Sequence, residues 1–292
     1  MTRERATATG LATTVIWASF VLLAVLTRPM PPLLLTAATF AIGGLTGLAW
    51  AAARGRLHVL RQIGWKVVAM GTIGLLGYHA IYLTALRIGP PAEVMLVNNL
   101  WPLLVVLGSA LLPGETLRPG HVLGGAIAFA GAALVVAGGT GAGGTGSLLG
   151  YGLALSAATV WASYSLLSRR MGAVPTESVA LFCLGTAVLA LPLHLMFEVP
   201  AAPASALGWA ALVALGLGPV GFAFYAWDIG VKHGNVQLLG VASYVTPLLS
   251  TLALVLTAVT EPRPILLVSA CLILAGALIA ARAGRRPLPT PG

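Results

Sequence analysis

The chain has 292 residues, of which 58% are hydrophobic and 8% are charged, and its formal net charge at pH 7 is +9. Soluble domains carry about 25% charged residues, so this composition is incompatible with an ordinary water-soluble domain and favours a protein embedded in lipid. The positive charge does not indicate a nucleic-acid partner, because the basic residues lie in short clusters between apolar runs, as in the loops of a membrane protein.

Ten apolar runs follow one another along the chain, each close to the ~20 residues that a helix needs to cross a ~30 Å hydrocarbon core. The connections between them carry proline, glycine and charge. The period-two alternation of a membrane β-barrel is absent, and backbone in lipid must satisfy its hydrogen bonds internally. The sequence therefore predicts an all-α integral membrane protein with ten transmembrane helices, at residues 10–27, 33–53, 67–86, 92–112, 120–138, 148–168, 177–197, 207–227, 236–259 and 265–282.

The basic residues divide unevenly between the two sides of these helices. With the N-terminus inside, only Arg28, Arg87 and Arg263 fall on the outer side. Because cytoplasmic loops carry an excess of Lys and Arg, we expect both termini in the cytoplasm. The cytoplasmic set is Arg3, Arg5, Arg54, Arg56, Arg61, Lys66, Arg118, Arg169, Arg170, Lys232, Arg282, Arg285 and Arg286.

The sequence resembles itself at a spacing of 144–145 residues. "WASF" at 17–20 returns as "WASY" at 161–164, and "WPLL" at 101–104 matches "TPLL" at 246–249. Further weak matches follow in the same order and at nearly the same offset, which indicates an internal repeat.

The repeat divides the chain into two five-helix halves, residues 1–146 and 147–292. Five is an odd number, so the second half must enter the membrane from the opposite face. Two inverted repeats with a binding site between them, near the bilayer midplane, are the architecture of many secondary transporters.

These features together resemble the drug/metabolite transporter superfamily: two five-helix halves, a "WAS" motif in the first helix of each, and a proline in the fourth. The chain is similar over almost its full length to EamA-type ten-helix exporters, and within them to bacterial aromatic amino-acid exporters. The resemblance implies export of aromatic and other neutral amino acids across the bacterial inner membrane. It also implies alternating access through a central cavity lined by helices 1, 3, 4, 6, 8 and 9.

Aromatic and polar residues lie near the middle of several predicted helices, although aromatic belts usually mark the membrane boundary and buried polar groups are costly. We predict that they line the substrate cavity, where rings offer flat apolar contacts and hydroxyl, indole and amide groups orient polar ends. The alternative is that they pack between helices and bond across helix interfaces. The candidates are Trp17, Tyr78, His79, Tyr82, Asn98, Trp101, Trp161, Tyr164, Ser243 and Tyr244.

Pro102 and Pro247 occupy matched positions in the two halves. Each removes a backbone donor inside a predicted span, which kinks a helix. We predict that they act as hinges when the transporter opens and closes; the alternative is a fixed bend.

Neither a metal site nor a cofactor is expected. Cys183 and Cys271 lie inside apolar runs without a histidine at ligand spacing, and no nucleotide-binding loop occurs. The expected partners are a small-molecule substrate and the lipid bilayer; a monomer is compatible with the sequence, which leaves the oligomeric state open. His79 could titrate near neutral pH, so proton coupling and facilitated diffusion both stay open.

The main alternative is a transporter of another metabolite or drug class in the same superfamily. A transporter of nucleotide sugars or phosphate esters would need Lys or Arg within the cavity, whereas every basic residue lies at a helix end or in a loop. An intramembrane enzyme would need an aspartate-rich cluster or an H-E-x-x-H motif, and neither is present. A chaperone or assembly partner is disfavoured only by the inverted repeat.

Overall fold

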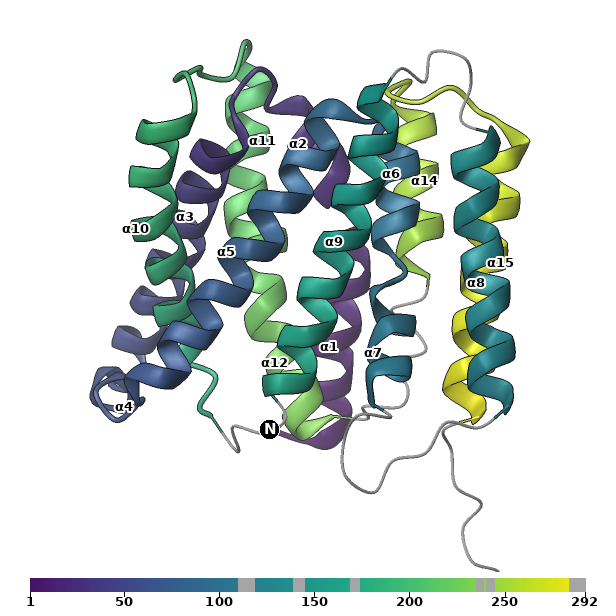
Figure 1. Ribbon diagram of the computed structural model, residues 1–292. Helices are drawn as coiled ribbons and strands as arrows, with labels where there is room; N and C mark the ends of the chain where they lie inside the picture. The colour runs from purple at the N-terminus through teal and green to yellow at the C-terminus, as the bar shows by residue number, and fades with distance from the viewer. Residues whose placement is uncertain (110–118, 139–144, 169–173, 235–238, 240–244, 284–292) are drawn as a thin grey trace, which may run out of the picture.

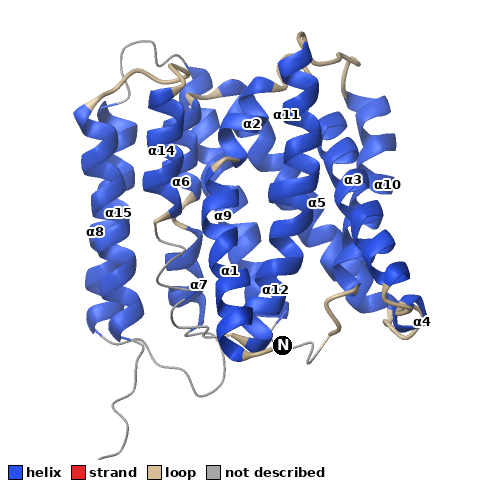
Figure 2. Cartoon of the chain, turned by 180° about the vertical axis from the view of Figure 1, so that it is seen from behind, coloured by secondary structure: helices blue, strands red, loops and turns tan. Residues whose placement is uncertain are grey.

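The computed structural model describes the chain apart from residues 110–118, 139–144, 169–173, 235–238, 240–244 and 284–292. Within the described residues every regular element is a helix (Figure 2), which confirms the predicted all-α class. The first half contains α1 (Arg3–Ala18), α2 (Phe20–Leu26), α3 (Pro32–Ala53), α4 (Leu57–Leu60), α5 (Trp65–Ile88), α6 (Pro91–Asn98), α7 (Trp101–Ser109) and α8 (Pro119–Gly138). The second half contains α9 (Thr145–Ser168), α10 (Ser178–Phe197), α11 (Ala206–Leu217), the π-helical turn η2 (Gly218–Phe222), α12 (Ala223–His233), α14 (Thr246–Leu256) and α15 (Pro264–Ala283).

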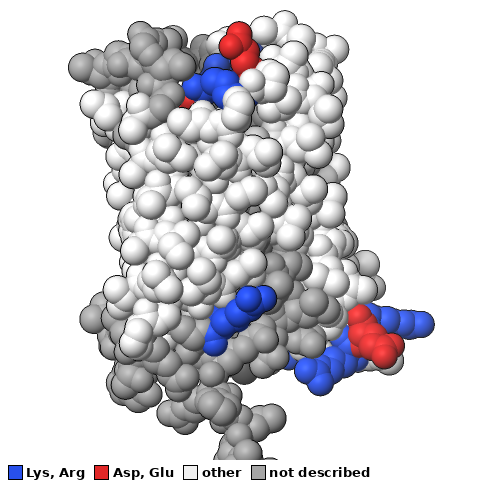
Figure 3. Space-filling view, turned by 90° about the vertical axis from the view of Figure 1, so that its right-hand side faces the viewer, with Lys and Arg blue, Asp and Glu red and all other residues white. Residues whose placement is uncertain are grey.

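Several of these helices are long and apolar enough to cross a membrane. The structure shows five such spans among the described residues, and three shorter apolar helices accompany them. The spans are Arg3–Leu26, Pro32–Ala53, Trp65–Ile88, Ser178–Phe197 and Ala206–Gly230. On the face seen in Figure 3, Lys, Arg, Asp and Glu gather toward the two ends and a broad uncharged belt separates them. This distribution is that of a multi-pass membrane protein.

The two ends of the bundle hold different polar contacts. At the upper end in Figure 1, which we call the Arg263 end, Arg263 pairs with Glu93, and Arg28 Nη2 donates to the Leu86 carbonyl oxygen at 2.6 Å. Arg87 lies there too, where its Nη2 donates to Thr27 Oγ1 at 3.0 Å. The three basic residues predicted to share the outer side therefore share one end.

The opposite end, which we call the Arg56 end, carries α4 and the N-terminus (Figure 1). Arg56 Nε lies 2.9 Å from Glu177 Oε1, and Lys232 Nζ lies 2.6 Å from Asp228 Oδ2. The Arg56–Glu177 pair joins the two halves of the chain at this end, whereas Lys232 and Asp228 lie one turn apart within α12.

Helix ends are capped by nearby side chains. Pro32 begins α3, where its missing N–H costs nothing, and the Glu198 carboxylate accepts from the next two amides, Leu33 at 2.9 Å and Leu34 at 3.2 Å. His194 Nδ1 lies 2.8 Å from the same carboxylate. These contacts tie the start of α3 to the end of α10.

Three predicted helices are interrupted. The first is split at Ser19 into α1 and α2, the fourth at Asn99 and Leu100 into α6 and α7, and the eighth passes through η2. Pro102 is consequently the second residue of α7, and Pro247 is the second residue of α14. The two prolines start helices instead of kinking them from within, because a first-turn position has no hydrogen bond to lose.

Helices from the two halves pack against each other. The most extensive contacts join α8 to α15, α3 to α10, α5 to α9 and α1 to α12. In Figure 1, α3, α5 and α10 form one side of the molecule and α8 with α15 the other, and the interrupted helices lie between them. Regions around the interruptions are therefore central.

Glycine backbones meet in several of these contacts, including those of α1 with α12 and of α5 with α9. A Cβ placed on Gly230 of α12 would fall 2.8 Å from the Cα of Gly10 in α1, close to the Arg56 end. A Cβ on Gly150 of α9 would fall 3.0 Å from the Cα of Gly89, which follows α5 at the Arg263 end. Any larger side chain would force either pair of helices apart.

Candidate substrate site

An aromatic cluster fills the region around the helix interruptions. Each of its rings has its centroid between 4.6 and 6.3 Å from another ring of the cluster. The cluster draws on α1, α2, α3, α5, α7, α9 and α12, so it joins the first half of the chain to the second. Its members are Trp17, Phe20, Phe40, Tyr78, His79, Tyr82, Trp101, Trp161, Tyr164, Phe224 and Trp227.

The π-helical turn exposes a carbonyl that the cluster satisfies. Trp17 Nε1 donates to the Pro219 carbonyl oxygen at 3.1 Å, and the Trp17 ring lies 5.2 Å from Trp227 and 6.2 Å from Phe224. Irregular backbone at membrane depth needs such partners, because lipid supplies none. The indole therefore stabilises the interrupted eighth helix and belongs to the cluster as well.

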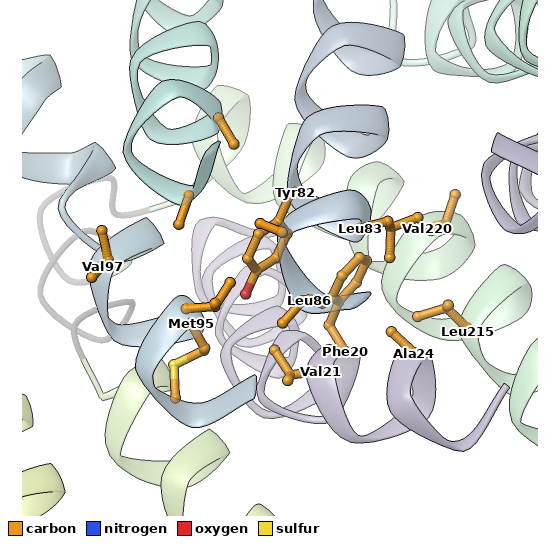
Figure 4. Close-up of a cluster of buried hydrophobic side chains, with 14 of the residues drawn as sticks. Phe20, Val21, Ala24, Tyr82, Leu83, Leu86, Met95, Val97, Leu215 and Val220 are labelled. Carbon is orange, nitrogen blue, oxygen red and sulfur yellow. The ribbon is translucent and has the colours of Figure 1, made fainter. Parts of the chain in front are cut away.

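Tyr78, His79 and Tyr82 share one side of α5, as the three- and four-residue spacing predicts. The Tyr78 ring lies 4.7 Å from His79 and 5.6 Å from Tyr82, and Tyr82 stacks on Phe20 at 5.7 Å. Figure 4 shows the Tyr82 side chain projecting from α5 into the space between α5 and the segment that carries Met95. Aromatic groups of α5 thus face both α2 and α6.

His79 is buried among rings. Its Nδ1 lies 2.9 Å from the Leu75 carbonyl oxygen, which can only accept, so Nδ1 carries the hydrogen. The ring centroid of Phe40 lies 4.6 Å away and that of Phe224 5.9 Å away. In the neutral imidazole, Nε2 then remains as an acceptor within the cluster.

Asn98 places an amide against the phenols of α5. It is the last residue of α6, and its side-chain Nδ2 donates to the Tyr78 hydroxyl at 3.0 Å. The same amide also interacts with the Tyr82 side chain. Asn99 differs, because its Nδ2 donates to the Met95 carbonyl oxygen of its own helix at 2.8 Å. Of the two adjacent asparagines, only Asn98 reaches the aromatic cluster.

The described part of the site is polar but contains no charged side chain. Among the described residues, the ring contacts and hydrogen bonds of the cluster involve no Lys, Arg, Asp or Glu. Asp228 lies outside the cluster, at the Arg56 end, and interacts electrostatically with Tyr164. The described part of the chain also holds no group of three or more His, Cys, Asp or Glu that could bind a metal ion.

Most of the residues predicted to line the cavity come together. Seven are ring members of the cluster and Asn98 is bonded to it, whereas Ser243 and Tyr244 lie outside the described residues. The additional rings of Phe20, Phe40, Phe224 and Trp227 were not predicted. A signal existed for Phe20, which ends the "WASF" motif, and for the pair Phe224 and Trp227, which lie three residues apart. Phe40 stands alone in an apolar run and gives no such signal.

The chain is similar to known exporters along almost its whole length. It is 48% identical over 291 residues, covering 98% of this chain and 100% of the relative, to the aromatic amino acid exporter YddG of Ancylobacter novellus. It is 30% identical over 265 residues, covering 86% of this chain and 88% of the relative, to the proteins of that name from Salmonella typhimurium. The same identity and coverage hold for the one from Escherichia coli.

A solved crystal structure with 47% sequence identity superimposes with a TM-score of 0.77, over 98% of this chain and 100% of the other. The sequence profile of the EamA-like transporter family matches residues 6–137 and again residues 148–282. Together the two matches span most of the chain. The protein therefore belongs to the EamA-like transporter family of the drug/metabolite transporter superfamily and is a multi-pass membrane transporter.

Proposed function

We propose that this protein exports amino acids, including aromatic ones, across the bacterial inner membrane, and that they bind at the aromatic cluster. The observation that carries the proposal is the cluster itself, a set of rings from both halves joined to an uncharged amide in the middle of the bundle. The relatives named as aromatic amino acid exporters support the substrate class.

The chemistry of the cluster fits this substrate class. Rings give an amino-acid side chain broad apolar contact, and neighbouring hydroxyl, imidazole and amide groups fix the orientation of its polar end. A phosphate ester would require Lys or Arg at the site, and the described contacts of the cluster contain neither. The site therefore favours small zwitterions over phosphorylated metabolites.

Ten transmembrane helices in two inverted halves, residues 1–146 and 147–292, complete the proposal. Support comes from the helices that carry the "WAS" motifs. α1 begins at the Arg56 end, beside the N-terminus, whereas Tyr151, near the start of α9, donates to Glu93 at the Arg263 end. The two helices thus run in opposite directions.

The packing of the bundle supports the same arrangement. Inverted halves relate the first transmembrane helix, which contains α1, to the sixth, which is α9. They likewise relate the third, which is α5, to the eighth, which contains α12. The contact of α1 with α12 then corresponds to that of α9 with α5, and these are two of the most extensive contacts. Each brings a pair of glycines together, at opposite ends of the bundle. The Arg56 end, which holds most of the described Lys and Arg, is then the cytoplasmic end and carries both termini.

The proposed transport mechanism is alternating access, and these two glycine contacts support it. In our proposal, separation of α1 from α12 opens the cluster to the cytoplasm, and separation of α5 from α9 opens it to the outside. The helix starts at Pro102 and Pro247 are the proposed hinges, because each proline is the second residue of its helix and α7 is separated from α6 by a break.

Uptake of radiolabelled amino acids into proteoliposomes tests the function. We expect protein-dependent flux of phenylalanine and tryptophan, weaker flux of leucine, and none of a sugar phosphate. Liposomes without protein are the control, and the same vesicles with an imposed pH gradient distinguish proton-coupled from facilitated transport. Absence of protein-dependent flux for every amino acid would refute the proposal.

A further inference from the structure

One buried polar atom of the site has no partner. Asn98 is 3% exposed, and while its Nδ2 donates to Tyr78, its Oδ1 receives no hydrogen bond. Within the described part of the chain, no residue of the aromatic cluster itself has a buried side-chain polar atom in this condition. Burial of a carbonyl oxygen without a hydrogen-bond donor destabilises the folded protein, so Asn98 Oδ1 is available to accept a hydrogen bond from a ligand.

The interruption between α6 and α7 adds to the same polarity. α6 ends at Asn98. Beyond it, the backbone N–H groups of Asn99 and Leu100 donate to the Met95 and Val97 carbonyl oxygens, and no further backbone N–H of the described chain continues the helix. The carboxyl end of a helix carries partial negative charge on its free carbonyl groups. The amide oxygen and the helix end therefore both favour a positively charged donor.

An amino acid offers one group that fits these requirements. Its α-ammonium group is positively charged and has three N–H donors, enough for an amide oxygen and neighbouring carbonyls. The side chain of the bound amino acid would then lie over Tyr78, which is bonded to Asn98, and over the rings that contact Tyr78. A neutral acceptor binds ammonium less strongly than a carboxylate does, which suits an exporter that must release its substrate.

We propose that Asn98 Oδ1, together with the carboxyl end of α6, binds the α-ammonium group of the transported amino acid. This inference rests on the proposed function and deepens it. Asn98 is then a specificity-determining residue: it selects molecules that carry a free amino group, and the aromatic cluster selects the side chain.

Competition against labelled L-phenylalanine in proteoliposomes tests the inference. L-phenylalaninamide retains the ammonium group, whereas 3-phenylpropionate retains the ring and the carboxylate but lacks the amine. For the unchanged protein we expect 3-phenylpropionate to reach half-inhibition only at a concentration at least about tenfold higher than L-phenylalaninamide needs. A ratio of this size corresponds to the loss of one hydrogen bond to a charged group. We expect Asn98→Leu to slow phenylalanine transport and to abolish this difference between the two competitors.

Asn99→Leu is the matched control. The Asn99 amide bonds only within its own helix, and its φ of −68° suits leucine, so this variant should keep the discrimination of the unchanged protein. Retained discrimination in Asn98→Leu would overturn the inference. So would equal competition by the two compounds in the unchanged protein, a comparison that does not depend on whether any variant folds. Phenylalanine flux without discrimination refutes only this inference, whereas absence of flux refutes the proposed function.

Discussion

At the scale of single residues, Trp161 connects the parts of the site. Its ring contacts Tyr78 at 4.9 Å, Tyr164 at 5.5 Å, and both Trp101 and Phe224 at 6.3 Å. Its position was predictable, because tryptophan in the middle of an apolar run departs from the usual belt at the membrane boundary. Phe40 was not predictable, since phenylalanine is ordinary in any apolar helix and only the folded chain shows which rings it meets.

Trp161→Leu should lower the transport of aromatic amino acids by about tenfold, because aromatic pairs contribute about 0.5–1.5 kcal/mol each beyond their burial. Transport of leucine, which gains less from ring contacts, should fall less. Initial rates of labelled tryptophan and leucine in proteoliposomes measure both effects.

Trp209→Leu is the control for this variant, because Trp209 is 51% exposed and lies outside the cluster. Its rates should match those of the unchanged protein. An equal loss of tryptophan and leucine transport in Trp161→Leu would contradict a role in selecting aromatic side chains.

At the scale of elements, most ends of the apolar runs were predictable, but the interruptions were not. The start of α3 at Pro32 and its end at Ala53 lie within one residue of the predicted run 33–53. The start of α1 at Arg3 and the end of α12 at His233, by contrast, lie six or seven residues beyond the predicted runs 10–27 and 207–227. Hydropathy does not register a break such as that at Asn99 and Leu100, because the helices on both sides of it are apolar. The break matters functionally, since it places Asn98 at a free helix end beside Tyr78.

The glycine contacts predict opposite effects at the two ends. Gly230→Leu should keep α1 and α12 apart and leave the cluster open to the Arg56 end, whereas Gly150→Leu should leave it open to the Arg263 end. Both variants should lose transport. The readout is a single cysteine at position 227, in a protein without Cys183 and Cys271, exposed to an impermeant thiol reagent from the Arg56 end. This cysteine should react faster in Gly230→Leu and slower in Gly150→Leu.

Gly152→Leu is the matched control, since a Cβ at Gly152 meets nothing within 4 Å. This variant should transport normally and label at the unchanged rate. If both contact variants label alike, the two contacts do not govern access from different ends.

At the scale of the whole molecule, charge and packing agree. The sequence assigned Arg28, Arg87 and Arg263 to one side from their positions between apolar runs, and the three gather at one end of the bundle. What sequence could not provide is the pairing of helices across the halves, such as α1 with α12, because those contacts join residues about two hundred positions apart.

The proposed orientation predicts which loops face the cytoplasm. A cysteine replacing Leu57, 44% exposed at the Arg56 end, should react with impermeant reagent only in inverted membrane vesicles. A cysteine replacing Val199, 84% exposed and next to the Arg28 loop, should react in intact cells. The reverse pattern would show that the chain is inserted the other way.

The most direct test of binding at the aromatic cluster is photolabelling with a phenylalanine that carries a diazirine on its ring. Light should attach it to peptides that contain Tyr78, Trp101 and Trp161, and excess L-phenylalanine should prevent the labelling. Adducts confined to the lipid-facing helix surfaces, and unaffected by L-phenylalanine, would contradict a substrate site between the two halves of the chain.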